Sequence, residues 1–225
     1  TAFEAQRNLL TRTFELDGGG SVAADSRGNV YVAWHASTQG APEGEVARQV
    51  WLARSRDEGR TFEPERAVNP MPTGACGCCG LRIFAASDGT VYLLYRSATN
   101  STHRHVYMLV SRNEGRSFQE RLIDKWEINA CPMTSSDLTE VAGRVLAAWQ
   151  TREEVYYATT ALGEPKMSLP VSAPREGKNR KYAFVAANAR GDTFLVWTEG
   201  TSWGKGGTLA WQVYDKNRRP TGKTG

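Results

Sequence analysis

The pentapeptide Val30-Tyr31-Val32-Ala33-Trp34 decides the fold, because the chain repeats its pattern three more times. The other copies read VYLLY at 91–95, VLAAW at 145–149 and TFLVW at 193–197. The aromatic residues that close the four copies are 61, 54 and 48 residues apart, and a turn containing glycine precedes each copy. Short apolar runs bounded by glycine turns are typical of β-strands. The sequence therefore predicts four copies of one β unit.

Each copy is flanked by further apolar runs. An alanine-rich run precedes it, as at 21–24, and a third run follows it, centred in turn on Trp51, Tyr107, Tyr156 and Trp211. A weaker fourth run follows, as at 66–68. Four strands per repeat and a period near fifty predict the blades of a β-propeller, in which radial stacking covers both apolar faces of every sheet. A β-sandwich would not repeat its turns in register.

We expect an all-β propeller of four-stranded antiparallel blades, with four blades recognisable at about 17–70, 71–128, 129–174 and 175–225. Small residues such as Ala23 and Ala85 suit the innermost strands, which crowd a central channel.

Two octapeptides indicate the type of propeller. They read SRDEGRTF at 55–62 and SRNEGRSF at 111–118. In each, Asp57 or Asn113 can accept backbone N–H groups, and the following glycine can take a positive φ. These octapeptides resemble the Asp boxes of sialidases and related BNR-repeat propellers. The resemblance implies a sialidase-like fold, and the boxes themselves are structural.

A sialidase ring has six blades, so two arrangements are open. Residues 1–16 could supply an outer strand that closes a four-bladed ring, or they could end a preceding blade in a longer protein that carries the remaining blades. We favour the longer protein, because the last repeat ends abruptly at 223–225. An incomplete ring would leave strand edges open to a protein partner.

Composition excludes several classes of protein. Of 225 residues, 40% are hydrophobic and aromatic residues are spread along the chain, so disorder is excluded. The 28 basic residues are scattered among 24 acidic ones, which argues against a nucleic-acid surface. No apolar run approaches the length of a membrane helix. Four cysteines favour a secreted or periplasmic protein. No signal peptide is visible at Thr1, as in a mature form, a fragment or a cytosolic chain.

The four cysteines form the best candidate site. They are Cys76, Cys78, Cys79 and Cys131. Counted back from the closing aromatic of its own repeat, Cys131 occupies the place of Cys76 and Cys78, so all four should meet at the channel mouth between adjacent blades. A disulfide from Cys131 to one of the others is the reading we favour. A copper or zinc site with thiolates, His103 and His105 is the alternative, and free thiols without a role are the third.

The resemblance to sialidases also implies a mechanism, with an arginine triad for the substrate carboxylate, a tyrosine nucleophile and an aspartate acid/base. LRIF at 81–84 is similar to the family's R-I-P motif, although Phe84 replaces proline. Arg82 is therefore a candidate for binding a carboxylate. Tyr182 is a possible nucleophile by position alone. No complete catalytic set can be identified, and whether the chain is an enzyme stays open.

We expect first an extracytoplasmic binding module that presents its Cys/His/Trp face to a glycan, a protein or a metal. Arg82, Arg96 and Trp203 are its ligand-binding candidates, with Trp203 in a glycine-rich loop where it could stack on a sugar. One alternative is an exo-glycosidase resembling sialidases. Another is a propeller that binds copper or zinc.

Overall fold

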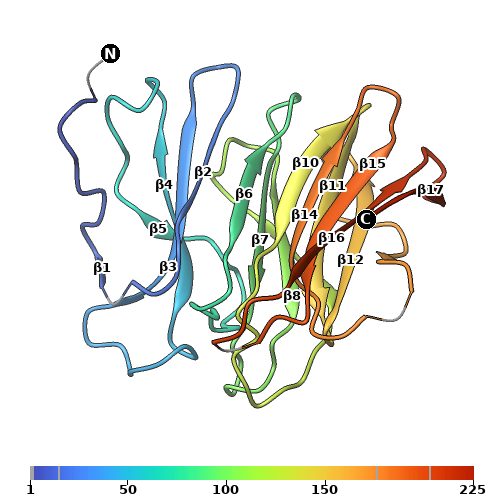
Figure 1. The fold of residues 1–225 in the computed structure, drawn as a ribbon. Coiled ribbons are helices and arrows are strands. Elements are labelled where there is room, and N and C mark those ends of the chain that lie inside the picture. The colour runs from blue at the N-terminus through green and yellow to red at the C-terminus, as the bar shows by residue number, and fades with distance from the viewer. Residues whose placement is uncertain (1–2, 15, 176, 203) are drawn as a thin grey trace.

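The computed structural model describes residues 3–14, 16–175, 177–202 and 204–225. Within these ranges the chain forms strands and no helix, so none of its described elements is a helix that could cross a membrane. Four antiparallel sheets stand side by side like the blades of a fan (Figure 1). The predicted all-β propeller architecture is confirmed.

The blades follow one another along the chain. The first consists of β2 (Ser21–Ala24), β3 (Val30–Thr38), β4 (Gln49–Ser55) and β5 (Arg66–Ala67). The second consists of β6 (Arg82–Ala85), β7 (Val91–Arg96), β8 (Val106–Ser111) and β9 (Gln119–Asp124). The third consists of β10 (Asp137–Val141), β11 (Arg144–Thr151), β12 (Glu154–Ala161) and β13 (Val171–Ser172). The fourth consists of β14 (Lys181–Ala187), β15 (Thr193–Glu199), β16 (Thr208–Tyr214) and β17 (Pro220–Thr224). All four repeated pentapeptides lie in second strands.

The N-terminal segment is attached to the first blade. Strand β1 (Thr13–Phe14) pairs with the far end of β3, where Thr13 lies opposite Thr38. The carboxylate of Glu65 accepts hydrogen bonds from the backbone N–H groups of Thr11 and Arg12 at 2.7 and 2.6 Å. The segment before β2 therefore adds to the first blade, where we had expected an outer strand of a preceding or closing blade.

The hydrophobic core lies between neighbouring blades. Leu52 and Ile83 belong to the cluster between the first and second blades, and Leu94 and Trp149 to the cluster between the second and third. Leu195 belongs to a third cluster, between the third and fourth blades. The innermost strands pack in the order β2, β6, β10 and β14. This packing brings the beginnings of the four innermost strands together.

The two octapeptide turns share one hydrogen-bonding pattern. Asp57 Oδ1 accepts the N–H of Thr61 at 2.8 Å, and Asn113 Oδ1 accepts the N–H of Ser117 at 3.0 Å. Gly59 takes a φ of +85°, which a glycine adopts without steric cost. Strand register places both turns at the end of the sheets away from the first residues of β2 and β6.

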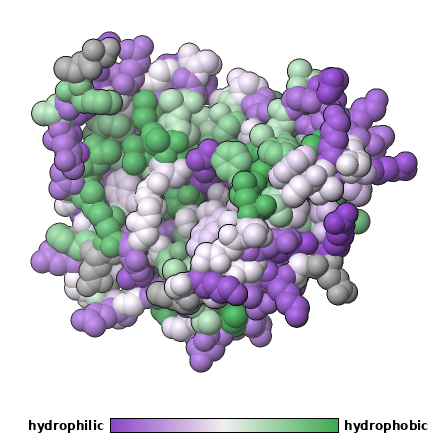
Figure 2. Space-filling view, in the orientation of Figure 1, coloured by the Kyte–Doolittle hydropathy of each residue, from purple (hydrophilic) through white to green (hydrophobic). Residues whose placement is uncertain are grey.

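Hydrophobic side chains are exposed on the two outermost blades, among them Val22 in the first and Phe184 and Leu209 in the fourth. Hydrophobic residues gather on the side where the N-terminal segment meets the first blade (Figure 2). A cavity of about 320 Å³ lies there, and Leu10 and Trp34 are among its lining residues. Within the described ranges no further blade covers these faces.

Candidate functional site

Four chemically different side chains occupy one register position in the four blades. Each stands on an innermost strand, opposite the residue that precedes the closing aromatic of the second strand. They are Ser21 opposite Ala33, Arg82 opposite Leu94, Asp137 opposite Ala148 and Phe184 opposite Val196. A propeller that repeats its backbone thus places a hydroxyl, a guanidinium, a carboxyl and a phenyl group side by side.

Arg82 and Asp137 form an ion pair across the boundary of the second and third blades. Arg82 Nε lies 3.1 Å from Asp137 Oδ1, and 43% of the arginine side chain is exposed against 5% of the aspartate. The Arg82 Nε atom is itself buried and makes no directed hydrogen bond to any described residue. The guanidinium is therefore held at one end by charge alone, and much of the side chain faces solvent.

Burial sets the acidity of Asp137. It raises the pKa of this carboxyl, although the N–H of Val185 and the charge of Arg82 act in the opposite direction. Val185 N donates to Oδ2 at 3.1 Å. Desolvation disfavours the charged form of a carboxyl, and a partner cation favours it. The result is an aspartic acid that keeps its proton to a higher pH than a solvated one, which suits a general acid.

Tyr182 lies on the neighbouring innermost strand, β14. Its side chain is 41% exposed, and its φ of +54° lies in the left-handed region. A register irregularity between Lys181 and Phe184 accommodates this conformation. The Tyr182 N–H donates to Thr134 Oγ1 at 3.2 Å, just before β10. A strained backbone tied to the Asp137 segment presents this phenol to solvent.

The other candidate arginine, Arg96, lies in the interior. Its side chain is 3% exposed and donates to the carbonyl oxygens of Arg104 and Gln150. The guanidinium also lies 5.4 Å from the ring centre of Trp126. Arg96 therefore contacts the protein itself rather than the outer surface. Trp203 lies outside the described residues.

The four cysteines meet between the second and third blades, as their spacing predicts. Cys78 and Cys131 form a disulfide, which confirms the predicted link from Cys131 to one of the other three. Cys76 Sγ lies 3.2 Å from Cys78 Sγ and 3.3 Å from Cys79 Sγ. Cys76 and Cys79 are buried free thiols.

The two free thiols differ in acidity. The hydrogen bond from Cys76 lowers the pKa of Cys79 to about 6, assisted by Arg96 and Arg104 and opposed by burial. The same hydrogen bond raises the pKa of Cys76, and burial adds to it. Of the pair, Cys79 is therefore the thiolate and Cys76 its proton donor.

The candidate histidines form a separate pair. The rings of His103 and His105 stack with their centres 5.2 Å apart. His105 Nδ1 lies 3.1 Å from the backbone of Trp126, and His103 Nε2 lies 3.9 Å from a Glu127 oxygen. Among the described residues, the one cluster of metal-ligand atoms within 4.8 Å of one another is Cys76, Cys78 and Cys79, without either imidazole.

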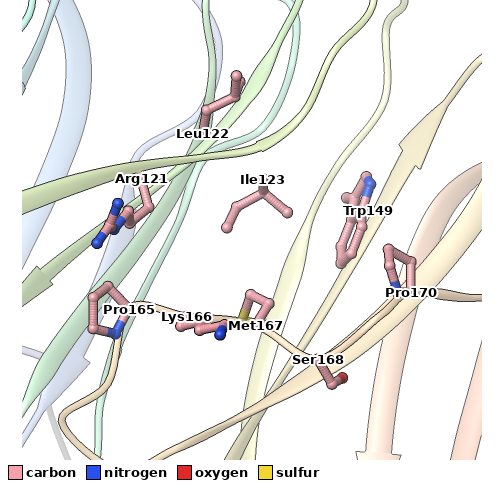
Figure 3. Close-up of a pocket in the computed structure, with 9 residues that line it drawn as sticks. All are labelled: Arg121, Leu122, Ile123, Trp149, Pro165, Lys166, Met167, Ser168 and Pro170. Carbon is pink, nitrogen blue, oxygen red and sulfur yellow. The ribbon is translucent and has the colours of Figure 1, made fainter.

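A cavity of about 360 Å³ lies farther out, beside the outermost strands (Figure 3). Ile123 of β9, Trp149 and Met167 are among its lining residues. Its basic side chains are Arg121 and Lys166, and no carboxylate lines it. It offers an apolar wall rather than a set of reactive groups.

Asp137 was missed in the sequence, although a signal for it exists. It stands 55 residues after Arg82, one repeat period later, and 12 residues before Trp149. The same count from the closing aromatics that aligned the cysteines therefore aligns Asp137 with Arg82. No residue type at that position marked it as reactive.

Comparison with known proteins supports the fold. No family profile and no curated protein match the sequence. An α-L-arabinanase of Penicillium chrysogenum complexed with arabinobiose matches with a TM-score of 0.66 and 14% identity, over 95% of this chain and 66% of that one. An α-L-arabinofuranosidase of Fusarium graminearum, in complex with an iminosugar inhibitor, matches with a TM-score of 0.66 and 13% identity, over 97% of this chain and 71% of that one.

A Hadza microbial sialidase matches with a TM-score of 0.54 and 17% identity, over 86% of this chain and 42% of that one. The chain thus spans about two thirds of the length of the two fungal enzymes and less than half of the sialidase. At these identities the likeness shows a fold shared with propeller glycosidases, and the sialidase-like class of propeller is supported.

Proposed function

We propose that the chain is an exo-glycosidase that acts on a terminal sugar bearing a carboxylate, with Arg82 binding that carboxylate and Asp137 as the general acid. The observation that carries the proposal is the half-exposed Arg82 beside the buried Asp137. The proposal follows the alternative that the sequence offered beside a binding module. Its support comes from the site and from a fold shared with arabinan- and sialoside-cleaving enzymes.

Arg82 provides the recognition step. A guanidinium binds a carboxylate through two parallel N–H···O hydrogen bonds, and its terminal nitrogens are free of directed hydrogen bonds to the described residues. A substrate carboxylate competes with Asp137 for the same cation. Its binding draws the guanidinium toward the ligand and uncovers the aspartic acid for the glycosidic oxygen.

Asp137 provides the proton. As the bond between the anomeric carbon and the leaving oxygen breaks, that oxygen takes the bonding electron pair and the proton of Asp137 and leaves as an alcohol. Loss of the Arg82 charge from beside the carboxyl, when Arg82 turns to the substrate, keeps the acid protonated until the bond breaks. Water later returns the proton.

Tyr182 is the proposed nucleophile. Sialidases are the glycosidases that use a tyrosine in place of the second carboxylate. Tyr182 is exposed on the strand next to Asp137, and its backbone is anchored to Thr134. Attack of its phenolate on the anomeric carbon forms a glycosyl-enzyme, which water hydrolyses.

A panel of fluorogenic glycosides tests the proposal, with a sialoside, a glucuronide and an α-L-arabinofuranoside as the three arms. We expect turnover of an acidic glycoside. Arg82→Ala should raise KM for it, and Asp137→Asn should lower kcat by a factor of about 100 to 10,000. Arg144→Ala is the matched control, because Arg144 is exposed at the opposite end of β10 and β11.

Two outcomes contradict the proposal. Glycan binding with an unchanged substrate after long incubation would establish a binding module instead. Turnover that Arg82→Ala and Asp137→Asn leave at the level of Arg144→Ala would place the chemistry elsewhere. Turnover of the arabinofuranoside alone would remove the role of Arg82 as a carboxylate ligand.

A further inference from the structure

We propose that the four cysteines also form a metal site: when the Cys78–Cys131 disulfide is reduced, Cys76, Cys78, Cys79 and Cys131 bind one Zn²⁺ ion through four thiolates. The site is independent of the proposed glycosidase chemistry. It lies between the second and third blades, which it would join in place of the disulfide.

The positions of the sulfur atoms carry the first part of the argument. The Sγ atoms of Cys76, Cys78 and Cys79 all lie within 4.8 Å of one another, with separations of 3.2 and 3.3 Å from Cys76. Tetrahedral Zn²⁺ with Zn–S bonds of about 2.3 Å places its sulfurs about 3.8 Å apart. Small side-chain movements are enough to bring three sulfurs to this spacing.

The fourth sulfur is held in place by the backbone as well as by the disulfide. Gly80, directly after Cys79, donates its N–H to Thr134 O at 2.9 Å and forms a parallel bridge with Ser135. The two cysteine-bearing segments therefore stay side by side when the S–S bond breaks. Cys131 remains within reach of the other three sulfurs.

The surroundings of the cluster suit an anionic centre. A Zn²⁺ ion with four thiolates carries two negative charges. The buried guanidinium of Arg96 contacts the Cys79 sulfur, and Arg104 is buried nearby with an Nε atom that has no hydrogen-bond partner among the described residues. Glu45 offsets one of these cations by its 2.6 Å contact with Arg104. Positive charge is left over to compensate the thiolates.

Burial indicates a structural rather than a catalytic metal. Cys76 and Cys79 are fully buried, and Ala98 packs on them. Structural zinc sites are closed by four protein ligands, whereas catalytic ones keep a position for water. Because the ligands come from two blades, binding of the ion would add to the stability of the folded chain.

The change of state balances with a dithiol reductant. The reductant transfers two electrons and two protons to the S–S bond of Cys78 and Cys131 and becomes a cyclic disulfide. Two thiols result, and Zn²⁺ binding then displaces the protons of the four thiols. The same cysteines thus join the blades by a disulfide under oxidising conditions and by a metal under reducing ones.

The test starts from the full chain, reduced with dithiothreitol without oxygen, desalted and titrated with Zn²⁺. Native mass spectrometry should show one ion per reduced chain and none on the oxidised chain. Cys79→Ser and Cys131→Ser should each weaken binding at least 100-fold. His103→Ala is the control and should bind as the wild type does. Failure of the reduced wild type to bind Zn²⁺ at micromolar concentration overturns the proposal.

X-ray absorption at the zinc edge on the wild type avoids dependence on variants that fail to fold. A shell of four sulfurs at about 2.3 Å supports the site. A shell containing imidazole nitrogen overturns it, because His103 or His105 would then be a ligand.

Discussion

Asp137 Oδ2 accepts a hydrogen bond from the backbone N–H of Val185 at 3.1 Å, so this buried carboxyl joins the third blade to the fourth. Its other oxygen faces Arg82 of the second blade. One side chain therefore has both a structural role and the proposed catalytic one. Substitutions that preserve the acceptor separate the two roles.

Asp137→Asn should keep the fold and lose turnover. The amide oxygen of asparagine can still accept the Val185 N–H, but the amide cannot serve as an acid. Asp137→Ala leaves that N–H without an acceptor and should cost about 1–3 kcal/mol of unfolding free energy. Urea unfolding of both variants measures the difference. Equal stability losses in the two variants would show that the hydrogen bond to Val185 contributes nothing.

His35 should make the stability depend on pH. It is buried on β3 with both ring nitrogens unpartnered among the described residues, and burial, assisted by Arg48, lowers its pKa to about 4, against the effect of Asp17. The unfolded chain binds a proton below about pH 6.5, but the folded chain does so only below about pH 4. Unfolding free energy should therefore fall as the pH drops through this window, by about 3 kcal/mol in all.

Denaturant unfolding at a series of pH values measures that slope. His35→Leu should flatten it between pH 6.5 and 4, whereas His103→Leu, at a partly exposed site, should leave it as in the wild type. A slope that survives in His35→Leu would assign the pH dependence to other groups.

Glu65 should hold the N-terminal segment to the first blade. Burial opposes its charge, but the hydrogen bonds from Thr11 and Arg12 lower its pKa to about 2. Glu65→Gln loses a charged acceptor and should cost about 1–3 kcal/mol. Trypsin should then cut after Arg12 at least ten times faster than in the wild type. Exposed Glu43→Gln serves as the control, and equal cleavage rates in the two variants would count against this role.

The disulfide should stabilise the chain by limiting its unfolded state. Cys78 and Cys131 are 53 residues apart, and closing a loop of that length corresponds to about 4 kcal/mol. Reduction should lower the urea midpoint accordingly. Addition of Zn²⁺ to the reduced chain should restore part of the loss if the metal site forms. A reduced chain as stable as the oxidised one would show that the backbone contacts of Gly80 are sufficient.

The candidate site was only partly predictable from the sequence. The count from closing aromatics brought Cys131 to the other cysteines, and the structure confirms this. Arg82 was found through a motif, but Asp137 was not, because a single aspartate at the start of a strand has no distinguishing pattern. Arg96 was placed near the outer face, whereas its guanidinium turns inward to carbonyl oxygens. Which way a long side chain turns depends on partners that are distant in sequence.

The sequence by itself determined the blades and their number, since alternation of apolar residues and glycine turns are local properties that repeat with the backbone. It also determined that the cysteines meet, because a repeated fold maps equal counts onto equal places. Tertiary structure alone decided which cysteine pairs with Cys131 and how deeply Asp137 is buried beside Arg82. Those properties arise where neighbouring blades exclude water from groups far apart in the chain, and burial there sets pairing and acidity.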